Sequence, residues 1–324
     1  MRDIITIDCH YLDQPEFAAA YLIVEGDEAA FVDNNTNHAL PRLLGALEDA
    51  GLEPGQVRHL IVTHVHLDHA GATSALAQAC PAATVLAHPR AARHIVDPGK
   101  LVASASAVYG EAEFARLYGK IEPVPAARVR EMADGETLSF GSRELTFLHT
   151  RGHANHHFCV ADSATNSIFT GDAFGLHYPA LQSDGPFAIP STSPTDFDGP
   201  LAREAVQRIV DLQPATLYPT HFGAVTAIEE TAGQLDRHLH FAEQAMLDAE
   251  ASNLPDDALY DSILPRLRDY FAGLLDGRGA LGNRAETWQL LEMDLDLNAQ
   301  GLAFAAARRR RKVREAREAG AGRT

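Results

Sequence analysis

The sequence predicts a layered α/β fold, with helices packed on sheets, followed by an all-helical C-terminal region. Short apolar runs of strand length alternate with segments of helical spacing as far as residue 225. Beyond Gly223 the apolar residues recur at steps of three and four, which is the period of a helix. We therefore expect an α/β domain over 1–225 and a helical extension over 226–324.

The first hundred residues carry clear strand and helix patterns. Apolar runs at 19–24 and 29–32 flank a turn that contains Gly and Asp, as a hairpin requires. A helix over 40–47 follows, with its leucines at helical spacing and Pro41 in its first turn. We expect four more elements here: a strand at 60–62, a helix ending at 79, a strand at 84–87 and a helix at 90–96.

Strands return after a stretch of mixed pattern at 97–130, which is expected to form short helices and loop over the sheet. The elements expected beyond it are a hairpin at 137–140 and 144–148, strands at 158–161, 167–170 and 216–218, and a helix at 201–212. The connection 173–200 is rich in Pro, Ser and Asp. Loops of this length inside a compact domain are commonly functional.

Composition excludes several classes of protein. The net charge of −17 argues against general nucleic-acid binding. The three cysteines, Cys9, Cys80 and Cys159, are too scattered for a disulfide framework, so we expect them to be reduced. The N-terminus lacks the apolar core of a signal peptide, and no apolar run reaches membrane-spanning length. We therefore expect a cytoplasmic protein that does not enter a membrane.

The most informative stretch is 63–71, Thr-His-Val-His-Leu-Asp-His-Ala-Gly, directly after a predicted strand. A strand that ends in a cluster of His and Asp is typical of a metal site. His64 and His66 are two residues apart, so both point to one side if strand geometry continues. Asp68 and His69 are consecutive and must diverge, which suits a second metal beside the first.

Three later motifs also follow predicted strands: Gly152-His153, Gly171-Asp172 and Thr220-His221. Together with 63–71, and in this order, they resemble the metal motifs of the metallo-β-lactamase superfamily. The resemblance covers residues 1–225. Within the superfamily, the motifs are similar to those of the glyoxalase II and lactonase branch. It implies an αββα sandwich whose site lies at the edge where the loops after the strands converge.

The resemblance also implies a role for each residue of these motifs. The first metal would be held by His64, His66 and His153, the second by Asp68, His69 and His221, and Asp172 would bridge the two. Imidazole and carboxylate groups suit zinc, iron or manganese, and zinc is expected. Two such ions about 3.5–4 Å apart lower the pKa of a shared water towards about 7, which makes a hydroxide nucleophile. Asp68 is also expected to orient that water.

Other residues are candidates for support of the site. Asp33 directly follows the predicted strand at 29–32 and could support the metal ligands from the side that faces away from the metal. His157 matches the last histidine of the glyoxalase II motif, from which this chain departs at Ala154 and His156. We expect His157 to be a hydrogen-bond partner of the site and not a ligand.

The substrate pocket is expected to draw on the connection 173–200. Phe174, His177 and Tyr178 follow Asp172 closely, and Phe222 follows the last motif histidine. Tyr178 could donate a hydrogen bond to an oxyanion. Packing of these side chains onto the core is the equal alternative.

The expected function is binuclear metal-dependent hydrolysis of a small-molecule substrate, namely an ester, lactone or thioester. The fold alone leaves alternatives, a di-iron protein that binds oxygen or nitric oxide and a sulfur dioxygenase. His66 favours a hydrolase, because flavodiiron proteins usually have Glu at this motif position. Motifs of RNA-processing phosphodiesterases are missing, as are C-terminal cations that would grip the carboxylates of glutathione.

Three amphipathic helices are expected over the C-terminal hundred residues, packed on the sandwich as a cap that restricts the substrate. A homodimer through these helices is the alternative. Asn298 interrupts the apolar stripe of the third helix, either as a satisfied buried polar group or at the mouth of the pocket. The basic run 308–314 is expected to be an exposed, partly frayed helix end, with contact to an acidic partner as the alternative.

Overall fold

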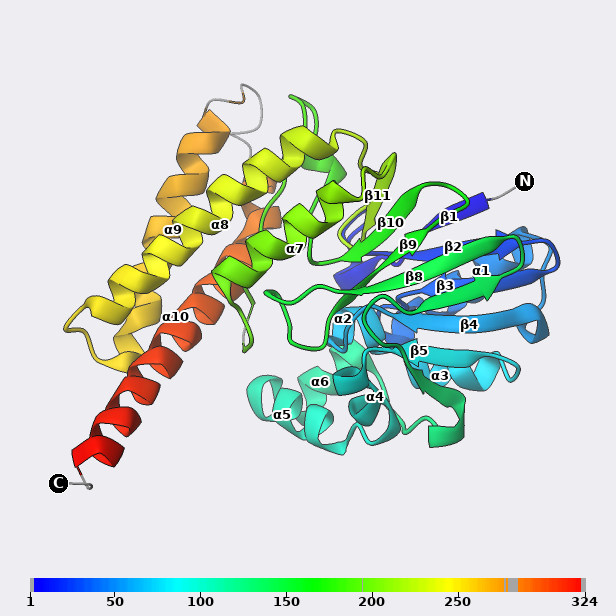
Figure 1. The fold of residues 1–324 in the computed structure, drawn as a ribbon, viewed down its shortest axis with the longest axis horizontal. Helices are drawn as coiled ribbons and strands as arrows, with labels where there is room; N and C mark the ends of the chain where they lie inside the picture. The colour runs from blue at the N-terminus through cyan, green and yellow to red at the C-terminus, as the bar shows by residue number, and fades with distance from the viewer. Residues whose placement is uncertain (1–2, 194, 277, 279–284, 322–324) are drawn as a thin grey trace.

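The computed structural model describes residues 3–321 with the exception of 194, 277 and 279–284. Two sheets face each other, and helices cover both outer faces of the pair (Figure 1). The long C-terminal helices stand together at one side of this sandwich. The predicted layered α/β fold with a helical C-terminal region is therefore confirmed.

The first sheet has six strands in chain order. They are β1 (Asp3–Asp8), β2 (Ala19–Glu25), β3 (Glu28–Val32), β4 (Val57–Val62), β5 (Thr84–Ala87) and β6 (Val129–Glu131). The pairs from β1 to β3 are antiparallel, and those from β3 to β6 are parallel. Parallel neighbours need long crossover connections, and helices supply them here.

The second sheet has five strands in the order β11-β10-β9-β8-β7. They are β7 (Thr137–Phe140), β8 (Arg143–His149), β9 (Phe158–Asp162), β10 (Ser167–Gly171) and β11 (Thr216–Pro219). Neighbours are antiparallel except for β10 and β11, which are parallel. The carboxyl ends of β10 and β11 therefore lie at the same edge of this sheet.

Ten α-helices are described. They are α1 (Leu40–Asp49), α2 (Leu67–Ala70), α3 (Thr73–Ala79), α4 (Pro89–Val96), α5 (Gly99–Tyr109), α6 (Glu111–Tyr118), α7 (Gly199–Asp211), α8 (Ile228–Ala251), α9 (Leu259–Asp276) and α10 (Ala285–Ala321). Among the residues with assigned structure, no helix is long and apolar enough to cross a membrane. The three cysteines are buried and free.

The alternation of side chains along each strand divides the core into layers. In β2, Leu22 packs with Leu43 of α1 on the outer side of the first sheet. The next residue, Ile23, packs with Phe147 and Phe169 of the second sheet in the middle of the sandwich. Successive side chains of a strand point to opposite faces, so both faces of this strand must be apolar.

The helical region shares one continuous core with the second sheet. Ile168 of β10, Ile209 of α7, Leu239 of α8, Phe271 of α9 and Leu302 of α10 all belong to it. The C-terminal helices therefore pack on the sandwich through α7 and the connection that precedes it. The domain boundary at 225 stays a prediction.

Two strands, β1 and β6, were not predicted. Both are edge strands, since β1 pairs with β2 and β6 pairs with β5 at the two ends of the first sheet. β6 has three residues, and none of them is buried. A pattern of buried residues therefore cannot reveal β6, and its pairing partner lies more than 40 residues away along the chain.

The helix predicted to run from the histidine motif to residue 79 is divided into α2 and α3. The backbone N–H of Ala72 donates to the carbonyl of Asn35 (2.9 Å), and the Asn35 amide donates to the carbonyl of Asp68 (3.0 Å). These bonds replace the regular helical bond between residues 68 and 72. The division anchors the motif to the loop after β3.

Arg143 forms a buried ion-pair network that the sequence did not reveal. Its fully buried side chain contacts Asp162 (2.6 Å) and Glu25 (3.0 Å), which joins the second sheet to β2 of the first. Hydrogen bonds from Ser142 and then Arg143 lower the pKa of Glu25 to about 2. The network is far from the histidine motifs and holds the sheets together.

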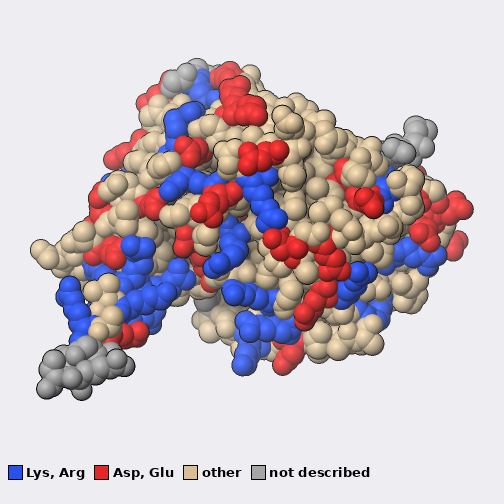
Figure 2. Space-filling model, viewed as in Figure 1, with Lys and Arg blue, Asp and Glu red and all other residues tan. Residues whose placement is uncertain are grey.

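The exposed, frayed end predicted for the basic run 308–314 was wrong in part. Figure 2 shows basic side chains gathered on the C-terminal part of α10, with acidic ones among them. Arg310 donates to the carbonyls of Ala249 (2.6 Å) and Ser252 (2.7 Å) at the end of α8, and Arg308 donates to that of Thr195 (2.9 Å). Cations at the end of a helix satisfy carbonyls that lack partners within it, so part of this run stabilises the fold.

Candidate metal centre

Strand ends of both sheets bring seven predicted site residues to one place. They come from the segment after β4, the turn between β8 and β9, and the ends of β10 and β11: His64, His66, Asp68, His69, His153, Asp172 and His221. Apart from His66 and Asp68, which are half-buried, these residues are buried. Segments up to 157 residues apart in sequence thus converge at one edge of the sandwich.

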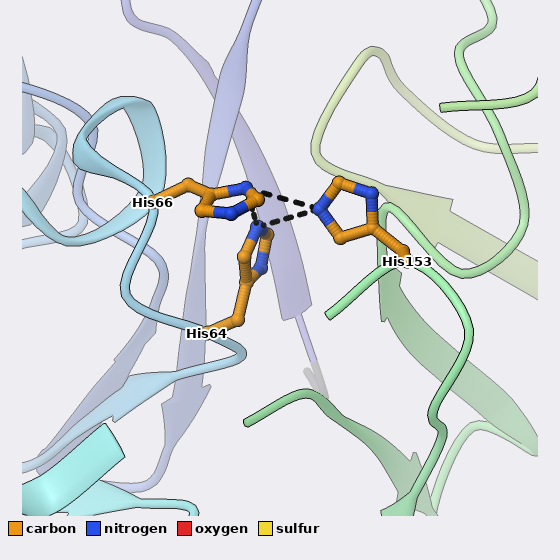
Figure 3. Close-up of side chains that lie close together, drawn as sticks. All are labelled: His64, His66 and His153. Atoms are coloured by element: carbon orange, nitrogen blue, oxygen red, sulfur yellow. Dashed lines mark hydrogen bonds between the residues drawn. The ribbon is translucent and has the colours of Figure 1, made fainter. Parts of the chain in front are cut away.

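The first group consists of three imidazoles that point at one another (Figure 3). Nε2 of His64 lies 3.0 Å from Nδ1 of His66, and Nε2 of His153 lies 3.2 Å and 3.0 Å from these two nitrogens. Burial lowers the pKa of all three side chains, which are therefore neutral. Neutral imidazole is the form that binds a metal ion.

The second group consists of Asp68, His69 and His221. Oδ2 of Asp68 lies 3.2 Å from Nε2 of His221 and 3.7 Å from Nε2 of His69. The potential ligand atoms of the group lie within 4.8 Å of one another. A carboxylate with two imidazoles is a donor set that suits zinc, iron or manganese.

Asp172 lies between the two groups. Its Oδ1 is 3.2 Å from Nε2 of His69 and 3.8 Å from Nε2 of His221, whereas its Oδ2 is 3.5 Å from Nε2 of His153. The buried Oδ1 of Asp172 and Nε2 of His69 face each other as an ion pair, and neither makes a hydrogen bond of regular geometry with any described residue. Buried polar atoms are nearly always paired, so their position fits a bound cation.

The histidines of the second group and the nearby aspartates shift one another's pKa values. Burial alone would lower the pKa of His69 and His221, but Asp172 and Asp68 outweigh it, so the pKa of His69 is well above its usual range and that of His221 rises to about 9. In turn, although burial raises the pKa of Asp68 and Asp172, His69 and its neighbours hold both below their ordinary range. In the metal-free site, His69 and His221 therefore carry protons at the position that a metal ion would occupy.

This protonation predicts that metal affinity increases with pH. A metal ion must displace the proton of His221, so the apparent affinity for Co²⁺ should rise up to about tenfold per pH unit for one proton, and level off near the pKa of about 9. Because the folded pKa lies above the ordinary 6.5, this proton stabilises the metal-free protein fully below pH 6.5 and the effect is lost as pH rises through about 9. Titrations of the metal-free protein from pH 6.5 to 9 measure both. An affinity independent of pH would contradict this arrangement.

Asp33 connects the histidine motif with the last strand. Its carboxylate accepts hydrogen bonds from the backbone N–H of Thr63 (2.8 Å), from Nδ1 of His69 (2.8 Å) and from the hydroxyl of Thr220 (2.7 Å). Once His69 has lost its second proton, the proton that stays on Nδ1 leaves the lone pair on Nε2, which faces the centre. Asp33 therefore lies where the sequence placed it, behind the residues that could hold metal.

Backbone carbonyls orient two further imidazoles in the same way. Nδ1 of His153 lies 3.2 Å from the carbonyl oxygen of Ser191, and Nδ1 of His221 lies 2.9 Å from that of Phe17. Because a carbonyl oxygen can only accept, both contacts place the proton on Nδ1. Nε2 of His153 therefore faces the centre with a free lone pair, and Nε2 of His221 does so once it has lost its proton.

His157 lies beside the centre but points elsewhere. Its Nε2 accepts from the backbone N–H of Asp172 (3.2 Å), and its Nδ1 lies 2.7 Å from the hydroxyl of Thr150. Both ring nitrogens are thus used. This position agrees with the expectation of a hydrogen-bond partner.

The predicted pocket residues lie at different distances from the centre. Phe174 is fully buried in the core. Nε2 of His177 donates to the carbonyl of Phe174 (2.8 Å), because a carbonyl oxygen can only accept. His177 and Phe222 line a cavity of about 510 Å³ next to His221. These two residues are therefore the predicted pocket residues that border open space.

Tyr178 packs beneath the second group. Its ring stacks on Phe17 (4.9 Å between centroids) and stands edge-on to His221 (6.3 Å). Its buried hydroxyl makes no hydrogen bond of regular geometry within the described chain but lies close enough to the carboxyl group of Asp294 to interact with it. Burial and then the carboxylate of Asp294, from α10, raise its pKa well above the usual range. The hydroxyl thus lies beside an acidic group, and its role as an oxyanion donor stays a prediction.

Sequence reasoning missed three features of the site. His156 packs against His64, with 6.1 Å between ring centroids. Burial raises the pKa of Asp294 to about 7, and the carboxylates of the centre add to this effect. The carbonyl of Ser191 orients His153. For Asp294 the available signal was an acidic residue within the apolar stripe of the last helix.

Comparison with known families gives a match over most of the α/β region. The sequence model of the metallo-beta-lactamase superfamily matches residues 13–221, which include the four motifs of the centre. A curated relative from Sulfurisphaera tokodaii, the metallo-beta-lactamase fold-containing protein ST1585, is 25% identical over 231 residues, which are 69% of this chain and 80% of the relative.

Solved structures extend the similarity of the fold. The crystal structure of ST1585 from Sulfolobus tokodaii superposes with a TM-score of 0.64 at 21% identity, over 93% of this chain and 98% of that one. TTHA1429 from Thermus thermophilus, described as a metallo-beta-lactamase family protein, gives 0.61 at 20% identity, over 96% and 93%. A peroxy diiron species of the chemotaxis sensor ODP gives 0.51 at 14% identity, over 72% and 89%. The first two superpositions must include part of the C-terminal helices, because 226–324 is about 31% of the chain.

Proposed function

Because the chain belongs to the metallo-beta-lactamase superfamily, we propose that it is a binuclear metal-dependent hydrolase that cleaves a small ester, lactone or thioester. The observation that supports this most is the position of Asp172 between two separate groups of donors. One carboxylate within reach of both groups suits a pair of cations, since its charge offsets their mutual repulsion.

The residues of the centre fit such a pair. His64, His66 and His153 would hold one ion, Asp68, His69 and His221 the other, and Asp172 both. When bound, two divalent ions polarise a carbonyl and lower the pKa of a shared water to about 7. Zinc is the metal we favour, with iron and manganese as alternatives, because no thiolate contributes to the donor set found among the described residues.

Asp68 lies where it could bind and orient the attacking water. Its side chain is 25% exposed, against 6% for Asp172, so it is the carboxylate of the centre that solvent and substrate reach. Contact with His221 fixes its orientation. A depressed pKa keeps Asp68 ionised at neutral pH, so it can accept a hydrogen bond from water and hold it towards a carbonyl carbon.

The surroundings of the centre favour a neutral substrate. The C-terminal region contributes the carboxyl group of Asp294 near Asp172 and Asp68. The ionised fraction of this third carboxyl group, whose pKa is about 7, repels carboxylates and phosphates. This supports an ester, lactone or thioester over a phosphodiester or a glutathione conjugate.

The competing function is that of a di-iron protein that binds oxygen or nitric oxide, or of a sulfur dioxygenase. The structural similarity to the di-iron sensor ODP concerns the fold alone. Metal analysis and a visible spectrum of freshly purified protein distinguish the hydrolase from the iron-containing alternative. Two zinc ions without colour would support the hydrolase, whereas stoichiometric iron with absorption that responds to oxygen would support the alternative.

A substrate screen tests the proposed function directly. The metal-loaded protein is assayed against lactones, thioesters, aryl esters and phosphodiesters, and in parallel after removal of metal by a chelator. We expect hydrolysis of at least one of the first three classes that is lost with the metal and restored by its return. Hydrolysis of phosphodiesters alone, or turnover unaffected by the chelator, would overturn the proposal.

A further inference from the structure

We propose that Asn298, on the C-terminal helix α10, is a positioning residue for His153, so that the C-terminal region is a structural part of one metal site. This inference rests on the proposed two-metal function. It differs from the role of a cap that restricts the substrate, because it makes α10 contribute to the strength of metal binding at the first site.

The side chain of Asn298 holds the segment 190–192 from both ends. Its Oδ1 accepts from the backbone N–H of Thr192 (2.7 Å), and its Nδ2 donates to the carbonyl of Pro190 (2.8 Å). The hydroxyl of Thr192 donates in turn to the carbonyl of Asn298 (3.1 Å). Asn298 and Thr192 are both buried, so few other partners could replace these bonds.

Gly301 provides a second and independent sign that α10 and this segment are fitted to each other. It lies one turn after Asn298, on the same side of the helix. A Cβ atom at Gly301 would overlap the carbonyl oxygen of Thr192 and approach the backbone of Ser193 (2.8 Å). The backbone of the helix therefore touches the backbone of the segment, which only glycine permits.

Ser191 lies between the two anchored residues, and its carbonyl faces the metal centre. This oxygen lies 3.2 Å from Nδ1 of His153. The contact holds the proton on Nδ1 and fixes the plane of the ring, so that Nε2 points at His64 and His66. With the peptide groups on both sides held by Asn298, the carbonyl of Ser191 has little freedom to turn away.

A chain of hydrogen bonds thus runs from α10 through the connection to one imidazole of the first group. His69 and His221 of the second group are oriented by Asp33 and by the carbonyl of Phe17, and these contacts do not pass through Asn298. Loss of the Asn298 side chain should therefore affect the site of His153 more than the other. Replacement of outer hydrogen-bond partners commonly costs about 10–100-fold in metal affinity.

The test measures Co²⁺ binding to the two sites separately. His153→Ala identifies the absorption bands of the first site by their loss, and His221→Ala identifies those of the second. Asn298→Ala and Gly301→Ala are then titrated with Co²⁺, with Gln300→Ala as the matched control. Gln300 lies on the same helix, is exposed, and bonds to Asp296 of α10 itself (2.7 Å). Melting temperatures of the metal-free variants report their folding.

We expect Asn298→Ala to weaken Co²⁺ binding at the first site by about tenfold or more, with a clearly smaller change at the second and none in Gln300→Ala. Equal weakening at both sites, or a lower melting temperature with unchanged Co²⁺ binding, would overturn the inference. If Asn298→Ala fails to fold, Thr192→Val removes only the hydroxyl bond and should show the same preference for the first site to a smaller extent. If the wild-type protein binds no Co²⁺, the proposed function is refuted. If the wild type binds Co²⁺ and Asn298→Ala binds it equally well at both sites, this inference alone is refuted.

Discussion

Replacement of Asp172 by alanine should abolish hydrolysis and remove metal from the centre. Asp172 lies within 4 Å of imidazoles of both groups, so its loss leaves two cations without the charge between them. We expect kcat/KM for any substrate found in the screen to fall by at least about a thousandfold, which corresponds to about 4 kcal/mol of lost transition-state stabilisation. Metal content should fall from two ions per chain to one or none, as measured by elemental analysis.

The control for this variant is Asp211→Ala, which removes an exposed carboxylate at the end of α7. It should keep both ions and full activity. Far-UV circular dichroism of Asp172→Ala should remain that of the wild type, because the fold is held by cores away from the site. An Asp172→Ala variant with two ions and normal turnover would show that the carboxylate does not bridge them.

Replacement of Asp33 by alanine should weaken both the fold and the metal centre. The buried carboxylate joins Thr63, His69 and Thr220, so its removal leaves three donors without a partner in the interior. The breaking of a buried charged network of this kind typically costs about 3–5 kcal/mol in the free energy of unfolding. Freed from Asp33, His69 can turn or change tautomer, and metal affinity should fall by about 10–100-fold.

Urea unfolding with and without metal measures both parts of this prediction. Asp49→Ala, an exposed carboxylate on α1, is the control and should change the free energy of unfolding by less than about 0.5 kcal/mol. An Asp33→Ala variant as stable as wild type, with unchanged metal affinity, would mean that Asp33 does not support the centre.

Most of the residues of the centre could be predicted because their motifs follow strands within a few residues along the chain. His64 and Asp172 follow strands whose apolar runs are plain in the sequence. Asp33 was predictable for the same reason, as a polar residue at the end of a buried strand. The resemblance of these short motifs to those of the metallo-β-lactamase superfamily therefore located the donors that the structure brings together.

Residues that act across long sequence distances were harder to predict. Asn298 is separated from Thr192 by 106 residues, so its spacing in the apolar stripe of α10 indicated burial but not its partner. Asp294 and Tyr178 approach each other through packing of α10 against the connection 173–200, which local patterns do not encode. The same holds for the basic run, whose arginines find carbonyls at the end of α8.

The position of α10 favours a role of the C-terminal region in support of the metal centre over a role as a cap alone. Its core is continuous with that of the second sheet, and its polar residues reach the segment that orients His153. A helix that only covered a pocket would be expected to contact substrate and leave metal binding unchanged. The contacts of Asn298 instead connect the folding of α10 to the metal centre.

The most direct test of the two-metal centre is a crystal structure of the metal-loaded protein with anomalous diffraction at the absorption edge of the bound metal. We predict two anomalous peaks about 3.5–4 Å apart, one among His64, His66 and His153 and the other among Asp68, His69 and His221, with Asp172 in contact with both. A single peak, or peaks held by other residues, would contradict this account of the centre.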